Sequence, residues 1–409
     1  MIMILLVSVA LYGLFCGWLP AAALVLCAFA CFLAARKVRN NKPLLILSVS
    51  GIAGVMLLSR LSRYASFRSL SLFAVFGLSY FGLQMISYLV DCYRGKTEAE
   101  RNPLTVMAYV LYFPLMYVGP INRFGDIRNS LEKYQGTLRD NIYDGLYRIS
   151  WGLFKKYLVA SRLAALFEPL ISERVRGISV LAVLTAYSVQ LYCDFSGGTD
   201  MVIGISRILG IEVSENFDNP FSAESIREFW RRWHMTLGSF LRDYVYIPLG
   251  GNRKGRLRRY LNTVITFTVS GLWHGINYLL WGLLHGLLAG SDWKIENRFL
   301  ARTVNFLLVS LLWCFFVYPD TVTALKMLVS VFTSFNLQPL IALLKDNVVM
   351  LALVGVLITV LFVKESSAKG KTLPDEWKFA VACALVLLTA ALGAYGVGYE
   401  VSDFIYSRF

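Results

Sequence analysis

The sequence predicts an all-α, polytopic integral membrane protein, because it is poor in charge, rich in long apolar runs and polar mainly in its middle region. Of its 409 residues, 57% are hydrophobic and 16% are charged, against about 25% charged in an average soluble protein. The apolar runs are residues 2–15, 21–35, 44–58, 70–90, 180–192, 303–318, 348–363 and 379–395. Several are slightly shorter than the roughly 20 residues of a perpendicular span. We therefore expect about ten to twelve membrane elements, some tilted, re-entrant or interfacial.

The runs connect without a soluble domain, which predicts one membrane domain made of three regions. Residues 1–69 and 291–409 are simple apolar helices. Residues 70–290 contain nearly all of the polar side chains in apolar surroundings, together with most of the glycine and proline, and we expect the functional core there. Residues 1–6 lack the charged start of a cleavable signal peptide, so the first run is expected to be retained.

Basic residues give the chain a formal charge of +14. In a soluble protein this excess would indicate nucleic-acid binding. Here the basic residues lie in short loops between apolar runs, which favours the positive-inside bias and contact with lipid headgroups. The strongest cluster lies within residues 242–259, and we place that loop in the cytoplasm.

Residues Ser225–Tyr246 differ from the predicted spans. Their apolar side chains recur at helical spacing, with tryptophans among them, and the opposite face carries arginines. This pattern predicts an amphipathic helix in the membrane interface. Ser222 or Ser225 could cap this helix, and Ser225 and Glu228 are spaced as a capping box.

The chain has three histidines: His234 in the predicted interfacial helix, and His274 and His285 in an otherwise apolar run over residues 269–286. If that run is one helix, the spacing of eleven residues places His274 and His285 on one face, together with Trp281. A neighbouring stripe of glycines would let another helix approach closely. These glycines are Gly271, Gly275, Gly282 and Gly286.

The presence of these histidines in apolar surroundings has two interpretations. They could simply form hydrogen bonds between helices, or they could take part in chemistry, since a titratable side chain at membrane depth is costly and imidazole is suited to proton removal near neutral pH. No G-x-S-x-G elbow supplies a serine nucleophile. The histidines are dispersed and the seven cysteines form no C-x-x-C pair. We therefore expect no metal site and no disulfide.

Two further segments carry polar groups in apolar surroundings. In the first, Asp194 and Asp200 flank Gly197–Gly198, which we expect to break the helix so that backbone groups line a cavity. Cys193 in this segment is more simply a buried thiol than a nucleophile. The second segment, residues 250–255, is rich in glycine and basic, and fits either a plain turn or a phosphate-binding loop.

Several of these segments, in consistent order, resemble the membrane-bound O-acyltransferase (MBOAT) family. The strongest are EFWRRWHMTLGSFLRDYVYIPLGGNRKG at residues 228–255 and LWHGINYLLWGLLHG at residues 272–286. Residues 87–104, 118–124 and 192–221 look like the same family. Within it, the resemblance favours the bacterial branch of the alginate O-acetylation protein AlgI, and next the teichoic acid D-alanylation protein DltB.

The resemblance implies a ring of helices around a thin centre, with funnels from both faces. The family's most constant histidine maps onto His274, and its second onto His234, so we expect His274 as the base and His234 as a positioning residue. His274 would lie near mid-membrane, at the floor of a cytoplasmic funnel. Candidate supporting residues are Asn277, Asp194, Asp200, His285 and Trp273.

The resemblance also implies a reaction: transfer of an acyl group, most simply acetyl, from a cytoplasmic thioester to a hydroxyl outside the membrane. The donor would be acetyl-CoA or an acyl carrier protein, with no bound cofactor, and Arg253, Lys254 and Arg256 would attract its phosphates. The acceptor would be a polysaccharide or teichoic acid outside the cell, and the protein itself would lie in the bacterial cytoplasmic membrane. An SGNH-type acyltransferase or a small helper protein is an expected partner. Binding of nucleic acid is not expected.

Two alternatives stay open from the sequence. One is D-alanyl transfer to teichoic acid from a carrier protein. The other is a proton-coupled transporter or channel, with a proton relay made of His274, His285, Asp194 and Asp200. The chain shows no internal repeat of the kind found in many transporters, which disfavours this second alternative.

Overall fold

The computed structural model describes residues 1–61, 77–116, 118–172, 175–367 and 373–394. Within those ranges every regular element is a helix, and the one extended pairing is an isolated bridge between Phe217 and Trp233. The predicted all-α class is confirmed. Parts of two predicted apolar runs, residues 70–76 and 395, lie outside the described ranges.

Five described helical segments are long and apolar enough to cross a membrane, which makes the chain a multi-pass membrane protein. A sixth span is available if α16 (Thr321–Thr333) and α17 (Gln338–Asp346), which meet at 91°, count as one broken span. Several other apolar runs form helices too short for this criterion. The ten to twelve elements expected include such short helices, so their exact number stays a prediction. The five segments are α2 (Trp18–Val38), α3 (Lys42–Leu61), α9 (Ile178–Ile208), α14–α15 (Arg298–Leu312 and Cys314–Val317) and α18 (Val348–Ser367).

The chain divides into two compact units. The first comprises residues 1–149 and 202–215. In it, the Tyr109 hydroxyl donates to the carbonyl oxygen of Asn122 (2.8 Å), and the hydroxyls of Tyr112 and Ser206 are hydrogen-bonded at 3.0 Å. Besides α2, α3 and the end of α9, it contains α1 (Ile2–Cys16), α4 (Leu78–Tyr93), α5 (Pro103–Val110), η2 (Phe113–Leu115), α6 (Phe124–Glu132) and most of α7 (Leu138–Leu153).

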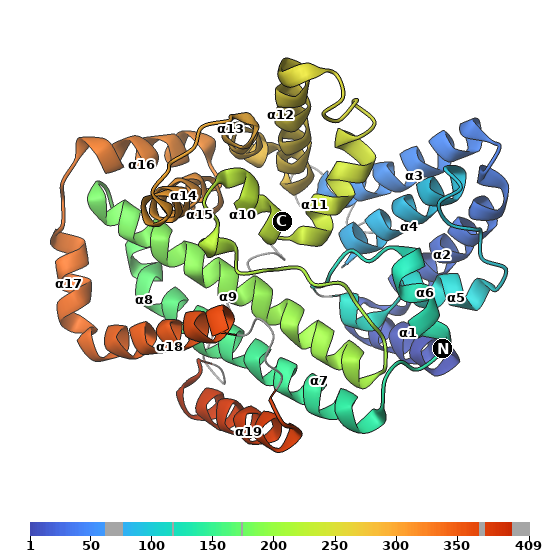
Figure 1. The fold of residues 1–409 in the computed structure, drawn as a ribbon, viewed down its shortest axis with the longest axis horizontal. Coiled ribbons are helices and arrows are strands. Elements are labelled where there is room, and N and C mark those ends of the chain that lie inside the picture. The colour runs from blue at the N-terminus through green and yellow to red at the C-terminus, as the bar shows by residue number, and fades with distance from the viewer. Residues whose placement is uncertain (62–76, 117, 173–174, 368–372, 395–409) are drawn as a thin grey trace. The chain divides into compact units, whose positions relative to one another are not determined.

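The second unit comprises residues 150–201 and 216–409 and contains all three histidines. Most of the long helix α9, drawn in green in Figure 1, belongs to it. Its other elements are the π-helix η3 (Phe154–Ala160), α8 (Ser161–Ser172), η4 (Pro220–Ser222), α10 (Ile226–Arg232), α11 (Met235–Leu241), the π-helix η5 (Arg242–Tyr246), α12 (Gly255–His274), η6 (Ile276–Tyr278), α13 (Leu279–Gly290), α14 to α18, and α19 (Asp375–Leu392).

Helix α9 runs without interruption through Gly197–Gly198. The predicted break there is wrong. A methyl group added to Gly197 would lie 2.8 Å from the carbonyl oxygen of Gly152. This glycine therefore serves close contact between two helices rather than an opening of the helix.

The predicted single helix over Ser225–Tyr246 is instead three short elements, α10, α11 and η5. The chain turns at His234, whose φ of +46° is in the left-handed region. Two backbone hydrogen bonds to a preceding segment hold the turn: Met235 N–H to Asn216 O (2.9 Å) and Asp218 N–H to Arg232 O (3.0 Å). Ser225 does cap α10 by accepting from the Glu228 N–H (3.2 Å).

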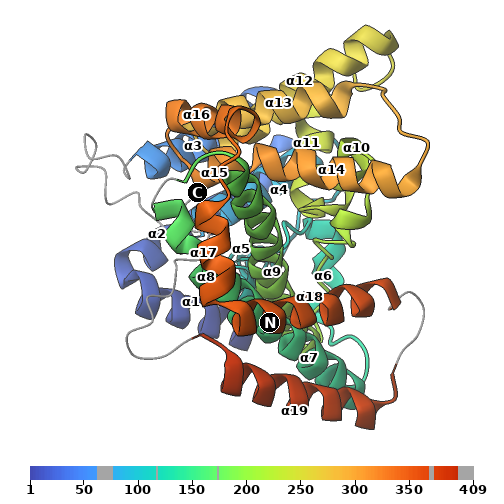
Figure 2. The same cartoon turned by 90° about the vertical axis from the view of Figure 1, so that its left-hand side faces the viewer.

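The run over residues 269–286 is not one helix. It ends one helix and begins another, with Gly275 at a φ of +140° between α12 and α13. The two helices lie side by side (Figure 1, Figure 2), and an added methyl group on Gly271 would meet the backbone of Tyr278. The predicted close approach along the glycine stripe is therefore present, but it joins the two halves of the run to each other. His274 and His285 consequently lie on different helices.

Candidate functional site

A cavity of about 810 Å³ lies within the second unit, between α10, α11, η5, α12 and the end of α13. Its described lining holds one histidine, His234, and no aspartate or glutamate. The charged side chains of the lining are all arginines: Arg227, Arg231, Arg242 and Arg259. A cavity that combines one imidazole with several guanidinium groups is suited to an anionic ligand whose chemistry needs proton transfer.

His234 has a defined environment at the wall of this cavity. Its side chain is buried, and its ring lies edge-on to Phe195 with the ring centroids 4.9 Å apart. Its Nδ1 atom lies 3.1 Å from Oδ1 of Asn216. Burial lowers the pKa of His234 to about 3, so the imidazole is neutral near pH 7. A neutral imidazole can accept a proton.

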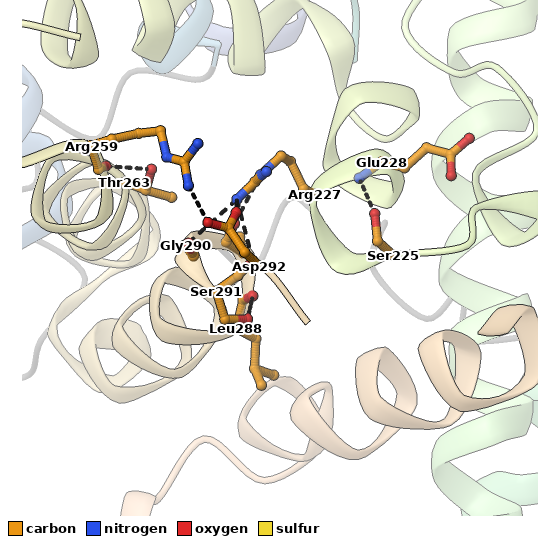
Figure 3. Close-up of polar contacts among 10 residues, drawn as sticks. Ser225, Arg227, Glu228, Arg259, Thr263, Leu288, Gly290, Ser291 and Asp292 are labelled. Atoms are coloured by element: carbon orange, nitrogen blue, oxygen red, sulfur yellow. Dashed lines mark hydrogen bonds and ion pairs between the residues drawn. The ribbon is translucent and has the colours of Figure 1, made fainter. Parts of the chain in front are cut away.

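Arg227 and Arg259 are partly neutralised. Both point toward Asp292, as Figure 3 shows, and each forms an ion pair with it. Desolvation pushes the pKa of the Asp292 carboxyl upward, but the hydrogen bonds from both arginines outweigh it and hold this pKa below its ordinary value. Arg227 also donates to the carbonyl oxygen of Ala289 (3.1 Å). These contacts fix the two guanidinium groups at the wall.

Arg242 and Arg231 leave more positive charge available. Arg242 pairs with the adjacent Asp243 at 2.9 Å, but its side chain is 64% exposed. Arg231 is exposed and has no ion-pair or hydrogen-bond partner among the described residues. A negatively charged ligand would find its strongest attraction at these two side chains.

The other two histidines are not part of this lining. His274 ends α12, is 5% exposed and lies among aromatic rings, with Trp281 and Phe316 at centroid distances of 5.6 and 5.8 Å. His285 is fully buried, and its Nδ1 accepts a hydrogen bond from the Trp230 indole (3.1 Å). His274 therefore does not line this cavity, and its expected place at the floor of a cytoplasmic funnel stays a prediction. Ser270, one turn before His274, is the nearest lining residue on α12.

Asp194 and Asp200 are held in a buried cluster of charges. Lys156 forms an ion pair with Asp194, and Lys155 lies 3.1 Å from Asp200 and 2.9 Å from Glu365. These lysines were absent from the sequence-based candidates, although two adjacent lysines in an apolar segment signal buried ion pairs. Neither aspartate lines the cavity.

The remaining predicted residues also lie outside the lining. Asn277 is exposed on η6, and Trp273 is half-buried on α12. Arg253, Lys254 and Arg256 are exposed in and just after the loop that precedes α12, whereas Asn252 of that loop lines the cavity. Within the described ranges, no three His, Cys, Asp or Glu side chains are placed to hold a metal ion.

Sequence reasoning also missed Asn216. A single asparagine in a polar loop carries no signal by itself. Its importance comes from the backbone pairing of its segment with the turn at His234, which only the folded chain shows.

The helices and the cavity define a multi-pass membrane protein with an arginine-lined cavity beside a buried, neutral imidazole. The model of the membrane-bound O-acyltransferase family matches residues 25–289, well over half of the chain. The chain belongs to this family.

Three relatives illustrate its range. The chain is 40% identical over 251 residues to the probable alginate O-acetylase AlgI of Pseudomonas fluorescens, covering 59% of this chain and 50% of that protein. It is 34% identical over 308 residues to the peptidoglycan O-acetyltransferase of Helicobacter pylori, covering 64% and 57%. It is 27% identical over 232 residues to the teichoic acid D-alanyltransferase of Bacillus subtilis, covering 53% and 58%. The chain thus spans about half the length of the curated relatives it matches.

Proposed function

We propose that this protein is a membrane O-acyltransferase that moves an acyl group, most simply acetyl, from a thioester donor to a hydroxyl of a cell-wall polymer or polysaccharide. Membership of the family and the names of the two O-acetylating relatives support the reaction class. The observation that carries the proposal is the cavity in which a neutral His234 lies among arginines.

The chemistry asks for a base and for an electrophile held near it. The acceptor hydroxyl gives its proton to His234, and its oxygen attacks the carbonyl carbon of the thioester. The carbon–sulfur bond then breaks, and the thiolate takes the proton back from the imidazolium. The products are an ester and a free thiol, and His234 returns to its neutral form.

The resemblance assigns the base to His274, and the geometry favours His234. Only His234 of the three histidines lines the cavity, while His274 lies among aromatic rings. His274 remains a predicted catalytic residue, with its role on the side of the acceptor.

The donor we propose is a phosphopantetheine thioester, carried either by coenzyme A or by a carrier protein. Its phosphates are anions, and Arg231 and Arg242 offer the least neutralised charge of the cavity lining. The basic residues between Arg242 and Arg259 favour a cytoplasmic mouth for this cavity. No bound cofactor is needed for the reaction.

The acceptor and partners follow from the same proposal. A polymer outside the bacterial cytoplasmic membrane supplies the hydroxyl, directly or through an SGNH-type acyltransferase or a small helper protein. Acetylation is favoured over D-alanyl transfer because the O-acetylating relatives are the more similar in sequence.

The test uses the full chain in proteoliposomes. Acetyl-CoA or an acetylated carrier protein is supplied with polysaccharide or peptidoglycan fragments, and both thiol release and ester formation are measured. We expect ester formation that depends on acceptor and falls at least about 100-fold in His234→Ala. Ester formation no greater than in protein-free vesicles, for every donor and acceptor pair, would overturn the proposal.

A further inference from the structure

Asn216 lies opposite His234, and its amide has only one orientation that fits its neighbours. The side chain of Asn216 is fully buried. Its Oδ1 accepts from the backbone N–H of Thr236 (3.2 Å) and from the Thr236 hydroxyl (2.9 Å). A backbone N–H can only donate, so the amide atom that faces it must be the oxygen. Nδ2 of Asn216 has no hydrogen-bond partner among the described residues.

This orientation decides where His234 carries its hydrogen. The same Oδ1 lies 3.1 Å from Nδ1 of His234 and can only accept. Nδ1 therefore donates, and the lone pair of the neutral ring is on Nε2. Without such a partner either tautomer is available to an imidazole.

The backbone of Asn216 also supports the strained turn. Its carbonyl oxygen accepts from the Met235 N–H at 2.9 Å, directly after His234 with its φ of +46°. A non-glycine residue in the left-handed region is strained and persists only where neighbouring contacts hold it. Asn216 therefore contacts this turn through both its backbone and its side chain.

We propose that Asn216 is a positioning residue that holds His234 in the Nδ1–H tautomer, so that Nε2 acts as the base in the cavity. The catalytic part of this inference rests on the proposed function. The tautomer of His234 does not depend on that function and can be measured separately. Asn216 acts through His234 and touches no reacting atom.

The charged groups of the cavity lining and of α9, whose Phe195 contacts the His234 ring, bear on any pH dependence. Those of the lining and of α9 are the same in every variant below, so differences between variants report on residue 216. They are Arg227 and Arg231 of α10, Arg242 of η5, Arg259 of α12, and the ion-paired Asp194 and Asp200 of α9.

The first experiment measures the tautomer by ¹⁵N NMR of the full chain labelled at histidine. With three histidines, the signals are assigned from His274→Gln and His285→Gln. We expect Nδ1–H and an unprotonated Nε2 at His234 in the wild type, and loss of this single tautomer in Asn216→Ala. An Nε2–H tautomer in the wild type would overturn the inference, whether or not the protein proves to be an acyltransferase.

The second experiment compares pH–rate profiles. Asn216→Ala should lower kcat about 100-fold, since a base in the wrong tautomer is nearly as harmful as its loss. Asn216→Asp keeps an acceptor oxygen and adds a negative charge, which favours the imidazolium. We expect it to retain more activity than Asn216→Ala and to move the acid limb of the profile about one pH unit or more to higher pH.

The control is Asn305→Ala, which removes another buried asparagine of the same unit that donates to a backbone carbonyl (Ala223, 3.0 Å). It should lower stability without moving the acid limb. An active wild type whose acid limb is unchanged in Asn216→Asp would refute the positioning role. An inactive wild type would count against the proposed function instead.

Discussion

His234 and His285 are both buried imidazoles of the second unit, yet they have opposite hydrogen-bonding roles. His234 faces an amide oxygen and lines a cavity with arginines. His285 accepts at Nδ1 from an indole and lies among aromatic rings. The first arrangement leaves a lone pair on Nε2 toward which a proton can move, whereas the second uses the Nδ1 lone pair to hold Trp230 in place. Burial and residue type alone therefore do not identify a base. The hydrogen-bond partner of Nδ1 decides whether the lone pair of the ring is on Nε2.

The largest expected effect separates His234 from His274 by chemical rescue. Either alanine variant should lose at least about 100-fold in kcat. Added imidazole should restore part of the activity of His234→Ala, because the cavity of about 810 Å³ has room for it. It should not restore His274→Ala, since His274 lies outside the lining of that cavity. The reverse pattern would return the role of base to His274.

A smaller effect is expected at His285, where we predict a loss of stability more than of chemistry. His285→Leu leaves the Trp230 indole N–H without its acceptor, at a cost of about 1–3 kcal/mol. His285→Gln supplies an oxygen in place of Nδ1 and should recover much of this loss. Thermal unfolding in detergent measures both variants. A pH–rate profile shifted in either variant would contradict the purely positional role of His285.

The smallest effects concern donor binding, where the cavity and the exposed loop can be compared. Arg231→Gln and Arg242→Gln should each raise KM for the donor about fivefold or less and leave kcat nearly unchanged. Neutralising Arg253, Lys254 and Arg256 together should raise KM less per charge, because these side chains lie outside the lining. Measured KM values in low salt provide the test. A larger effect of the loop than of Arg231 and Arg242 would move the phosphate site to the loop.

The buried cluster of Lys155, Asp200 and Glu365 also differs from the cavity, since its lysine is ion-paired with both carboxylates. The sequence drew attention to the aspartates and missed their partners. An isolated carboxylate in an apolar segment indicates that a partner exists. Which residue serves as that partner depends on which helices meet.

The sequence by itself determined the membrane class, the position of the long apolar helices, a serine cap at the start of α10 and the family. These features depend on composition, on the spacing of apolar residues and on contiguous sequence segments, so they can be predicted without knowing which segments meet in the fold. It also predicted that glycines would mediate close helix contacts, although not between which helices.

Only the tertiary structure decided the arrangement of the candidate site. The breaks at His234 and Gly275 are set by contacts with Asn216 and by the pairing of α12 with α13 rather than by helical propensity. The periodic pattern of both segments continues across these breaks, so it predicted single helices that tertiary contacts override. The same contacts bring Asn216 to His234, eighteen residues along the chain. Whether an imidazole has a cavity on one side and an acceptor on the other is a property of that packing, and no single segment of the sequence contains it.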